Sequence, residues 1–297
     1  MMSSRTSHFR YTAVTGFFEQ DSPTGPHETT TLPGLGLISR PYETDTTLSS
    51  ANENTNWERF LHYLDHLNKS SSSGVFYKLI IAARHGEGYH NVKEAEVGTV
   101  EWEAHWARLE GDGKTVWADA HLTPKGIGQA QAMKVFWEDA ASSLKLPLPR
   151  HHYASPLTRC LQTCELAFTD LKPAPGVENP PFNPIIKEMI RERLGIHTCD
   201  RRSSRSVIHE NHPLFAIEEG FSEADELWVP DVRETLEEHA VRIKAFLDDL
   251  FENDSEQIIS VTAHSGSILA LYVTTGHEEV RVAPGGIVPV LIKAEAI

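Results

Sequence analysis

Long apolar runs are missing from this chain of 297 residues. No segment approaches the roughly 18 consecutive apolar residues that span a lipid bilayer. Residues 1–18 also lack the continuous apolar stretch of a secretory signal, although an amphipathic organelle-targeting segment remains an alternative for them. We therefore expect no membrane partner, and we expect a cytoplasmic protein.

Cysteine is scarce as well, with Cys160, Cys164 and Cys199 as its three occurrences. Three cysteines cannot form the disulfide framework of a secreted domain, and an odd number favours a reducing compartment. Cys160 and Cys164 lie four residues apart on an expected helix. We interpret these two as small buried side chains rather than as a redox pair.

Basic residues are outnumbered, because 27 Lys and Arg face 42 Asp and Glu and leave a net charge of −15. A nucleic-acid partner would need a basic face, so we expect no binding to nucleic acid. The acidic balance also opposes long-range capture of an anionic substrate. Any phosphate site must therefore be a local positive pocket.

The histidines do not have the spacing of a zinc site. His209 and His212, like His85 and His90, lack the four-residue separation of a zinc-binding helix, and no paired cysteines are present. Residues 34–36 (Gly-Leu-Gly) lack the later glycines and the lysine of a nucleotide-binding loop. We predict no metal and no cofactor.

The N-terminal quarter differs in composition from the rest of the chain. Residues 1–56 show no sustained periodicity and are rich in Ser, Thr, Pro and Gly, which indicates an irregular extension along the domain surface. Apolar residues at three- and four-residue steps predict a short helix at 57–67, followed by a Ser/Gly linker at 70–74. We therefore divide the chain into an extension, 1–75, and a folded domain, 76–297.

From residue 76 onward, short apolar runs alternate with helical patterns. Strands are predicted at 78–83, 152–154, 184–187, 257–262 and 287–292, the last at a sheet edge because it contains Pro289. Helices are predicted from 123 onward, through 160–166, over 236–250 and from 268 onward. Repeated β–α units predict an α/β fold, a three-layer α/β/α sandwich with a mostly parallel sheet. Its active site should lie beyond the C-terminal ends of the strands.

Three of these strands end in a cation or an imidazole. Arg84 and His85 follow the first strand, Arg159 follows the second, and His264 follows the strand at 257–262. Because parallel strands end at the same side of a sheet, we expect these side chains to converge.

This combination suits chemistry at a phosphoryl group. A neutral imidazole nitrogen can attack phosphorus, while fixed cations hold the oxygens whose charge must be accommodated in the transition state. Arginine suits the second role because its planar fork donates two hydrogen bonds to a phosphate and never deprotonates. Gly86 and Gly266 would let the backbone approach the site closely. We predict metal-independent phosphoryl transfer through His85.

Five motifs follow one another in a fixed order. They are 84–87 (Arg-His-Gly-Glu) with Asn91, 122–126 (Leu-Thr-Pro-Lys-Gly) with 129–130, 155–159 (Ser-Pro-Leu-Thr-Arg), 197–202 (His-Thr-Cys-Asp-Arg-Arg) and His264. This set resembles the histidine phosphatase superfamily, in its phosphoglycerate-mutase-like branch, and is most similar to fungal phosphomutase-like proteins. The resemblance covers roughly residues 76–293, which makes this region a histidine phosphatase catalytic domain.

The resemblance implies specific roles for the motif residues. It implies a covalent phosphohistidine on His85 and a phosphate pocket formed by Arg84, Arg159 and His264, with Asn91 lining it. Ser265 directly follows His264, and we expect it either to donate a hydrogen bond near the phosphate or to cap the following helix.

The resemblance also implies a carboxylate proton donor after the third strand, for which there are two candidates. Glu192 stands in 190–195, similar to the family's Leu-Arg-Glu followed by Gly, but with a spacing one residue shorter. Glu188 lies four residues earlier. We favour Glu192 and keep Glu188 open. The true donor must be neutral when the substrate arrives, so we expect partial burial to raise its pKa.

Five arginines lie between residues 191 and 205: Arg191, Arg193, Arg201, Arg202 and Arg205. They are either a surface network paired with carboxylates or a clamp for a second anionic group of the substrate. For the clamp we name Arg201 and Arg202.

The function that combines these observations is hydrolysis of a small phosphorylated metabolite. The alternatives are a phosphomutase, which returns the phosphoryl group to another carbon, and a binding module that holds phosphate without turnover. The polar residues of 195–204 favour water access, and a mutase must exclude water from its intermediate. We therefore expect net phosphate release from sugar- or polyol-type monoesters.

Overall fold

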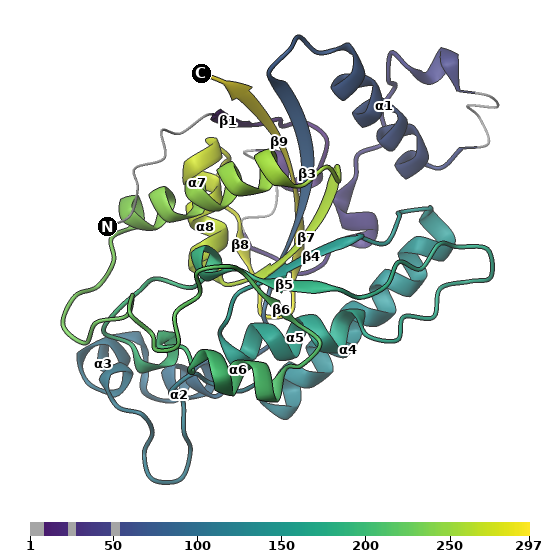
Figure 1. Cartoon of the computed structure of the whole chain (residues 1–297). Coiled ribbons are helices and arrows are strands. Elements are labelled where there is room, and N and C mark those ends of the chain that lie inside the picture. Colours follow the sequence, from purple (N-terminus) through teal and green to yellow (C-terminus); the bar gives the residue numbers. More distant parts are fainter. Residues whose placement is uncertain (1–8, 23–27, 49–53) are drawn as a thin grey trace.

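The computed structural model of the chain describes residues 9–22, 28–48 and 54–297, and a mixed sheet forms its centre (Figure 1). Its strands are β1 (Phe9–Ala13), β3 (Val75–Arg84), β4 (His151–Ala154), β5 (Pro184–Ile186), β6 (Ala216–Ile217), β7 (Ile258–Ala263) and β9 (Ile287–Ala296). The order across this sheet is β1-β9-β3-β7-β4-β5-β6. From β3 to β6 neighbouring strands are parallel, whereas β9 is antiparallel to both β1 and β3. The mostly parallel α/β architecture is thus confirmed.

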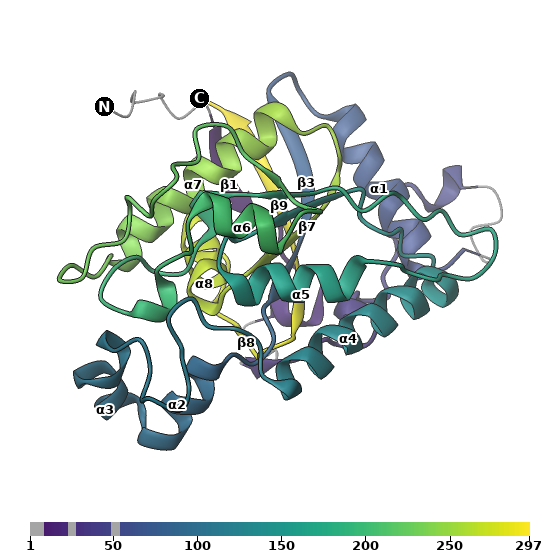
Figure 2. The same ribbon diagram turned by 60° about the horizontal axis from the view of Figure 1, so that its bottom comes forward.

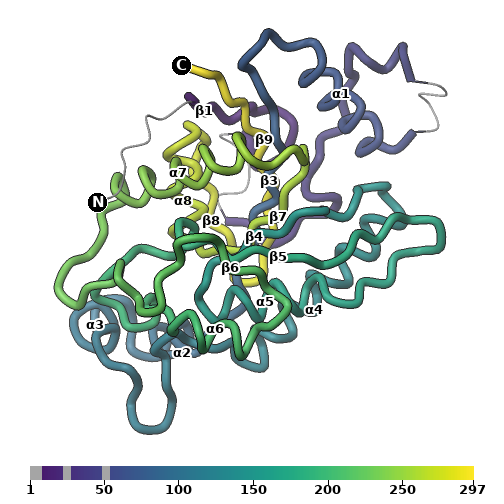
Figure 3. Tube along the Cα trace, viewed as in Figure 1, coloured from purple at the N-terminus to yellow at the C-terminus, as the bar shows by residue number. Residues whose placement is uncertain are grey.

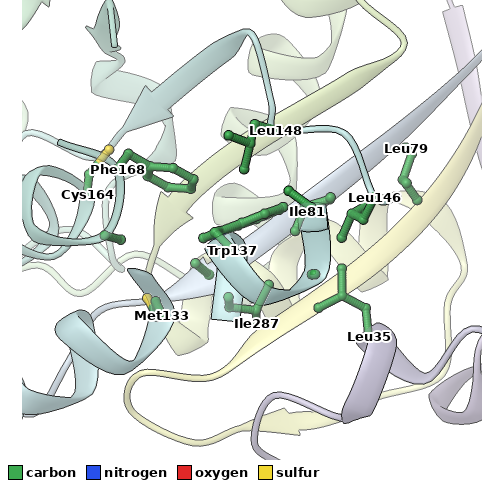
Figure 4. Close-up of a cluster of buried hydrophobic side chains, with 14 of the residues drawn as sticks. Leu35, Leu79, Ile81, Met133, Trp137, Leu146, Leu148, Cys164, Phe168 and Ile287 are labelled. Carbon is green, nitrogen blue, oxygen red and sulfur yellow. The ribbon is translucent and has the colours of Figure 1, made fainter. Parts of the chain in front are cut away.

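Helices cover both faces of the sheet. One layer contains α1 (Asn56–Ser70), α4 (Pro124–Asp139) and α5 (Thr158–Phe168), and the other contains α7 (Leu236–Asn253) and α8 (Ser265–Thr275). Successive side chains of β3 point to opposite faces of the sheet, which divides the hydrophobic core into two layers. Leu79 and Ile81 lie in the first core layer, with α1, α4 and α5, and Ile80 and Ala82 lie in the second, with α7 and α8. Figure 4 shows Trp137 of α4 among the side chains of the first layer.

The start of α4 illustrates how local signals specify an element. Thr123 is the N-cap of this helix, and its hydroxyl accepts a hydrogen bond from the N–H of Gly126. Pro124 occupies the first helical position, where no N–H is needed. The predicted helix start at residue 123 is confirmed.

A smaller unit, residues 89–120, lies at one end of the molecule (Figure 2). It contains α2 (Tyr89–Val97) and α3 (Thr99–Ala104) and has a small core of its own around Trp102 and Trp117. We call it the α2–α3 unit; the periodicity of the sequence did not predict its helices. The remaining α-helix of the described residues is α6 (Arg205–Asn211). No helix in the described part of the chain has both the length and the apolar character that crossing a membrane would require.

The N-terminal segment is more regular than predicted. Strand β1 pairs with β9 along one edge of the sheet, so the expectation of irregular structure is wrong for residues 9–13. Figure 3 shows this strand beside the C-terminal strand. Phe18 and Leu35 are completely buried in the first core layer, and α1 confirms the helix predicted at 57–67. Two further short strands, β2 (Glu28–Thr29) and β8 (Arg281–Val282), form a separate parallel pair.

The strand that contains Pro289 is not at the edge of the sheet, so that prediction is wrong. β9 lies between β1 and β3, but β1 pairs only with residues 292–296. Pro289 lies beyond this pairing, and its carbonyl accepts a hydrogen bond from the Gln20 side chain at 3.3 Å. A strand residue directs its N–H and C=O to the same side. The missing N–H of Pro289 therefore interrupts no pairing between strands.

Candidate active site

A cavity of about 420 Å³ lies beyond the C-terminal ends of the parallel strands. Residues in the loops after β3 and β5 and at the starts of the helices after β4 and β7 line it, as the alternation of strands and helices predicted. Its lining comprises Glu28, Arg84, His85, His90, Asn91, Glu94, Trp102, Glu103, Arg159, Glu192, Arg193, His197, Cys199, Asp200, Arg233, Ser265, Gly266, Leu269, Glu279, Val280, Arg281 and Val282.

Arg84, the last residue of β3, supplies a cation with unused donors. One terminal nitrogen donates to the carbonyl of Val282 at 2.9 Å, and its Nε is buried without a hydrogen-bond partner. Burial lowers the pKa of this guanidinium, although an arginine stays charged at any physiological pH. A half-buried, incompletely bonded guanidinium at a cavity wall is a site for an anion.

His85 directly follows Arg84 and is almost fully buried. Its Nδ1 lies 2.7 Å from the carbonyl oxygen of Gly86, and its Nε2 lies 3.2 Å from the Nε of Arg159. A carbonyl accepts and a guanidinium donates, so Nδ1 carries the proton and Nε2 carries the lone pair. Burial, together with the charges of Arg159 and Arg84, holds the pKa of His85 well below its ordinary value of 6.5. The ring is therefore a neutral nucleophile.

Two glycines position the turn that carries His85. A Cβ on Gly86 would lie 2.4 Å from the carbonyl oxygen of Gly126, and a Cβ on Gly126 would lie 2.1 Å from that of Glu87. Neither contact is sterically possible, so only glycine lets the turn lie this close to the start of α4. The N–H of Gly86 also donates to the Thr163 hydroxyl on α5 at 3.1 Å.

Arg159 is held in place by a buried carboxylate. Its terminal nitrogen NH2 lies 2.9 Å from Asp200, whose other oxygen accepts from Arg233 at 2.9 Å. Burial would raise the pKa of Asp200, but Arg233 and Arg159 together hold it below its ordinary value. Asp200 was not predicted as a site residue, although it lies within the 197–202 motif, which was the available signal.

Glu192 is the candidate acid that reaches the cavity. Its carboxylate accepts hydrogen bonds from the N–H of Gly266 at 3.0 Å and from the N–H of Arg193 at 2.9 Å. A Cβ on Gly266 would lie only 1.8 Å from Oε1 of Glu192. Gly266 thus makes room for this carboxylate at the start of α8.

Glu188 has a different environment and does not line the cavity. Its carboxylate is 2.7 Å from a terminal nitrogen of Arg191 and 3.0 Å from Nε of Arg202. Both cations are almost fully buried. The structure therefore places Glu188 as a buried ion-pair partner outside the lining of the cavity, whereas Glu192 lines it.

The remaining predicted phosphate ligands are distributed differently. Asn91 and Ser265 line the cavity, and Oδ1 of Asn91 accepts from the N–H of Gly88 at 3.0 Å. His264 does not line the cavity. Its ring centroid lies 5.1 Å from that of His85, and its Nε2 is 2.7 Å from the Ser155 hydroxyl. Folding thus places the ring of His264 next to that of His85, but outside the lining of the cavity.

Arg201 and Arg202 do not form the predicted clamp, because neither reaches the cavity. Arg201 pairs with Glu110 at the surface and lies over the ring of Trp228. Arg202 is buried, where it pairs with Glu188 and lies 4.0 Å above the ring of Phe221. Both guanidinium groups are therefore paired with carboxylates of the protein, Arg201 with Glu110 and Arg202 with Glu188.

The described residues include one group of three potential metal ligands, His197, Cys199 and Asp200. Metal binding requires a thiolate, whereas burial, and after it the charge of Asp200, raises the pKa of Cys199 well above its ordinary value. The Asp200 carboxylate is already shared by Arg159 and Arg233. This donor set does not suit a cation.

Several residues of the lining were not predicted: His90, His197, Arg233, Glu28 and Arg281. For His197 the signal was its place inside the 197–202 motif, and for His90 it was its place between 84–87 and Asn91 of the first motif. The other three residues, Glu28, Arg233 and Arg281, belong to no motif. They reach the cavity only because folding brings distant segments of the chain together.

Comparison with known proteins identifies the family. A family model described as the histidine phosphatase superfamily (branch 1) matches residues 80–281. The chain belongs to this superfamily. The relationship confirms the resemblance found in the motifs and agrees with the mostly parallel sheet.

Curated members of the superfamily from fungi are similar over most of the chain. A "Probable phosphoglycerate mutase" of Arthroderma benhamiae is 42% identical over 287 residues, which cover 96% of this chain and 84% of that protein. "Phosphomutase-like protein 3" of Candida albicans is 39% identical over 220 residues, 73% of this chain and 66% of that protein.

Among solved structures, a mycobacterial glucosyl-3-phosphoglycerate phosphatase is 19% identical, with a TM-score of 0.37. The matched region covers 66% of this chain and 80% of that protein.

Proposed function

We propose that this protein is a metal-independent phosphomonoester hydrolase that acts through a covalent phosphohistidine on His85. The observation that carries the proposal is the orientation of His85, whose Nε2 lone pair meets a guanidinium while Nδ1 is bonded to a backbone carbonyl. A second guanidinium with unused donors, Arg84, lines the same cavity.

In the first step, Nε2 of His85 attacks the phosphorus atom and forms a P–N bond while the bond from phosphorus to the alcohol oxygen breaks. Arg84 and Arg159 hold the phosphoryl oxygens, and Asn91 lines the same cavity. Glu192 gives its proton to the departing alkoxide.

In the second step, a water molecule attacks the phosphorus of the phosphohistidine. Glu192, now a carboxylate, accepts a proton from this water, and the P–N bond breaks. The products are inorganic phosphate and the original neutral His85 with its proton on Nδ1. No metal takes part in either step, because the arginines supply the positive charge.

Hydrolysis is favoured over mutase activity by two features of the cavity. Several residues of its lining are exposed to solvent, among them Ser265, Glu103 and Arg281, so water can reach the phosphohistidine. The arginines expected to clamp a second anionic group, Arg201 and Arg202, lie elsewhere. The names of the fungal relatives favour a mutase of the phosphoglycerate type as the second candidate.

The test uses p-nitrophenyl phosphate and 3-phosphoglycerate as substrates of the full-length protein. We expect nitrophenol release by the wild type, loss of release in His85→Ala, and unchanged release in the control His209→Ala, whose side chain is exposed on α6. Rapid quenching without acid should leave labelled phosphate on the wild type only.

The same samples separate the alternatives. Interconversion of 2- and 3-phosphoglycerate at a rate comparable with hydrolysis would establish the mutase. Binding of phosphate with no nitrophenol release would establish a binding module, and a fully active His85→Ala variant would exclude covalent catalysis on this residue.

A further inference from the structure

One wall of the cavity comes from the α2–α3 unit. His90 and Glu94 of α2 and Trp102 and Glu103 of α3 all line the cavity that contains His85. The two arginines that hold the phosphate come from other elements, with Arg84 at the end of β3 and Arg159 on α5. The wall formed by α2 and α3 is thus available to the rest of the substrate.

His90 has unused hydrogen-bonding capacity at this wall. Its side chain is 7% exposed, and neither ring nitrogen has a hydrogen-bond partner among the described residues; Nδ1 is fully buried. Its ring centroid lies 5.5 Å from that of His85. A buried polar group without a partner is costly unless a ligand supplies one.

His90 is also uncharged. Burial, and then the charge of Arg159, lowers its pKa well below 6.5. A neutral imidazole offers one donor and one acceptor, the pair that an alcohol hydroxyl group also carries. A carboxylate or a second phosphate on the substrate would gain no ion pair from such a ring.

The outer part of the cavity carries mainly negative charge. Glu94 and Glu103 extend from the α2–α3 unit, and Glu28 and Glu279 lie among the other lining residues. Arg281 also lines the cavity, whereas the guanidinium of Arg193 donates to the carbonyl of Glu234 and that of Arg233 donates to the Asp200 carboxylate. A second anion on the substrate would therefore meet like charges outside the phosphate pocket.

We infer that His90, Glu94 and Glu103 form a subsite for the leaving group, which selects phosphomonoesters of uncharged, hydroxyl-bearing alcohols over those that carry a second anion. This inference rests on the proposed function. His90 binds a hydroxyl of the alcohol, and the two carboxylates exclude an acidic group in the same place. They are specificity residues, not groups of the phosphoryl-transfer step.

The experiment compares sn-glycerol 3-phosphate with 3-phosphoglycerate, which carries a carboxylate where the former has a hydroxymethyl group. For the wild type we expect higher kcat/KM on glycerol 3-phosphate. In the double variant Glu94→Gln, Glu103→Gln this preference should fall about tenfold, the size expected for removal of like charges near the surface. Gln at 103 keeps an acceptor for His197, which contacts Glu103 at 2.9 Å.

The matched control is Glu101→Gln, which removes an exposed carboxylate from the same helix at a position that does not line the cavity. The preference of this variant for glycerol 3-phosphate over 3-phosphoglycerate should equal that of the wild type. His90→Phe should raise KM for glycerol 3-phosphate about tenfold more than it raises KM for p-nitrophenyl phosphate, whose leaving group carries no alcohol hydroxyl, whereas His90→Gln should retain part of the binding of glycerol 3-phosphate. Thermal unfolding of each variant verifies that it is folded.

The outcomes distinguish the two proposals. If the wild type releases no nitrophenol, the proposed function fails. If nitrophenol is released but the preference between the matched substrates is the same in the double variant, the subsite is disproved and the hydrolase stands. Equal losses on all substrates in both His90 variants would likewise exclude a role toward the leaving group.

Discussion

The Nε of Arg159 lies 3.2 Å from Nε2 of His85, so the nucleophile's lone pair is held by the cation that would bind the phosphate. A phosphoryl group that enters the site must take over this hydrogen bond, because its oxygens are stronger acceptors than an imidazole. Once it does so, phosphorus lies next to the released lone pair. Substrate binding and alignment of the nucleophile are thus one event.

The ring of His85 should remain neutral well below pH 6.5. Burial and the two nearby arginines lower its pKa, so protonation is disfavoured where an ordinary histidine becomes charged. Nitrogen-15 NMR of the imidazoles, with His85→Gln for assignment, should show the Nδ1–H form unchanged from pH 8 to pH 5.5. A titration of this signal near pH 6.5 would contradict the electrostatic account of the site.

Replacing Glu192 should produce a dependence on the leaving group. The variant Glu192→Gln cannot donate a proton, so we expect a loss on the order of 10²–10⁴ in rate with an alkyl phosphate. With p-nitrophenyl phosphate the loss should be much smaller, since nitrophenolate leaves without protonation. Steady-state rates on both substrates check this.

Glu188→Gln is the natural comparison. Removing the negative charge of Glu188 leaves the buried cations Arg191 and Arg202 with one carboxylate fewer. We expect a loss of stability of about 3–5 kcal/mol, measured by urea unfolding, without a leaving-group signature. If that signature appeared in Glu188→Gln and not in Glu192→Gln, the assignment of the acid would be reversed.

Activity should survive exhaustive chelation. The positive charge at the cavity comes from guanidinium groups. Among the potential metal ligands, the carboxylate of Asp200 is already paired with Arg159 and Arg233. Vanadate, which adopts the five-coordinate geometry of phosphorus, should inhibit. Initial rates with and without EDTA decide the matter, and loss of activity that zinc or magnesium restores would show a metal enzyme.

The pair formed by Asp21 and His277 should make stability depend on pH. Burial opposes charge on His277, but the Asp21 carboxylate, 3.1 Å from Nε2, raises its pKa above 6.5. The folded state therefore binds the proton more tightly than the unfolded chain does. The stabilisation is complete below pH 6.5 and is lost as the pH rises through the folded-state pKa.

The variant His277→Gln isolates this contribution. Its unfolding free energy should fall about 1.5–3 kcal/mol below that of the wild type at pH 6, a range typical of hydrogen bonds to charged groups, and the difference should shrink at pH 9. Urea unfolding at both pH values measures it. A difference that is constant with pH would mean that the pair does not involve a charged histidine.

Local patterns predicted the elements of the central sheet well. The apolar runs at 78–83, 152–154, 184–187 and 257–262 correspond to β3, β4, β5 and β7, because strands buried on both faces need continuous apolar residues. The pattern failed for α2 and α3, which pack mainly around Trp102 and Trp117 and not against the sheet. It failed for β1 because an edge strand of five residues with one buried face gives a weak signal.

The sequence by itself determined which residues follow the strands: Arg84 and His85 after β3, Arg159 after β4, and Glu192 beyond β5. Parallel strands end on the same side of a sheet, so the order of motifs along the chain was enough to bring these groups to one cavity.

Only the tertiary structure decided which charged groups face that cavity. Glu188 and Arg202 neutralise each other, Asp200 meets Arg159 across 41 residues, and Glu192 meets Gly266 across 74. In the sequence Glu188 and Glu192 are two carboxylates four residues apart after the third strand, and only the resemblance of 190–195 to a family motif favoured Glu192. They differ because a buried charge requires a partner, and distant segments of the chain supply those partners only after folding.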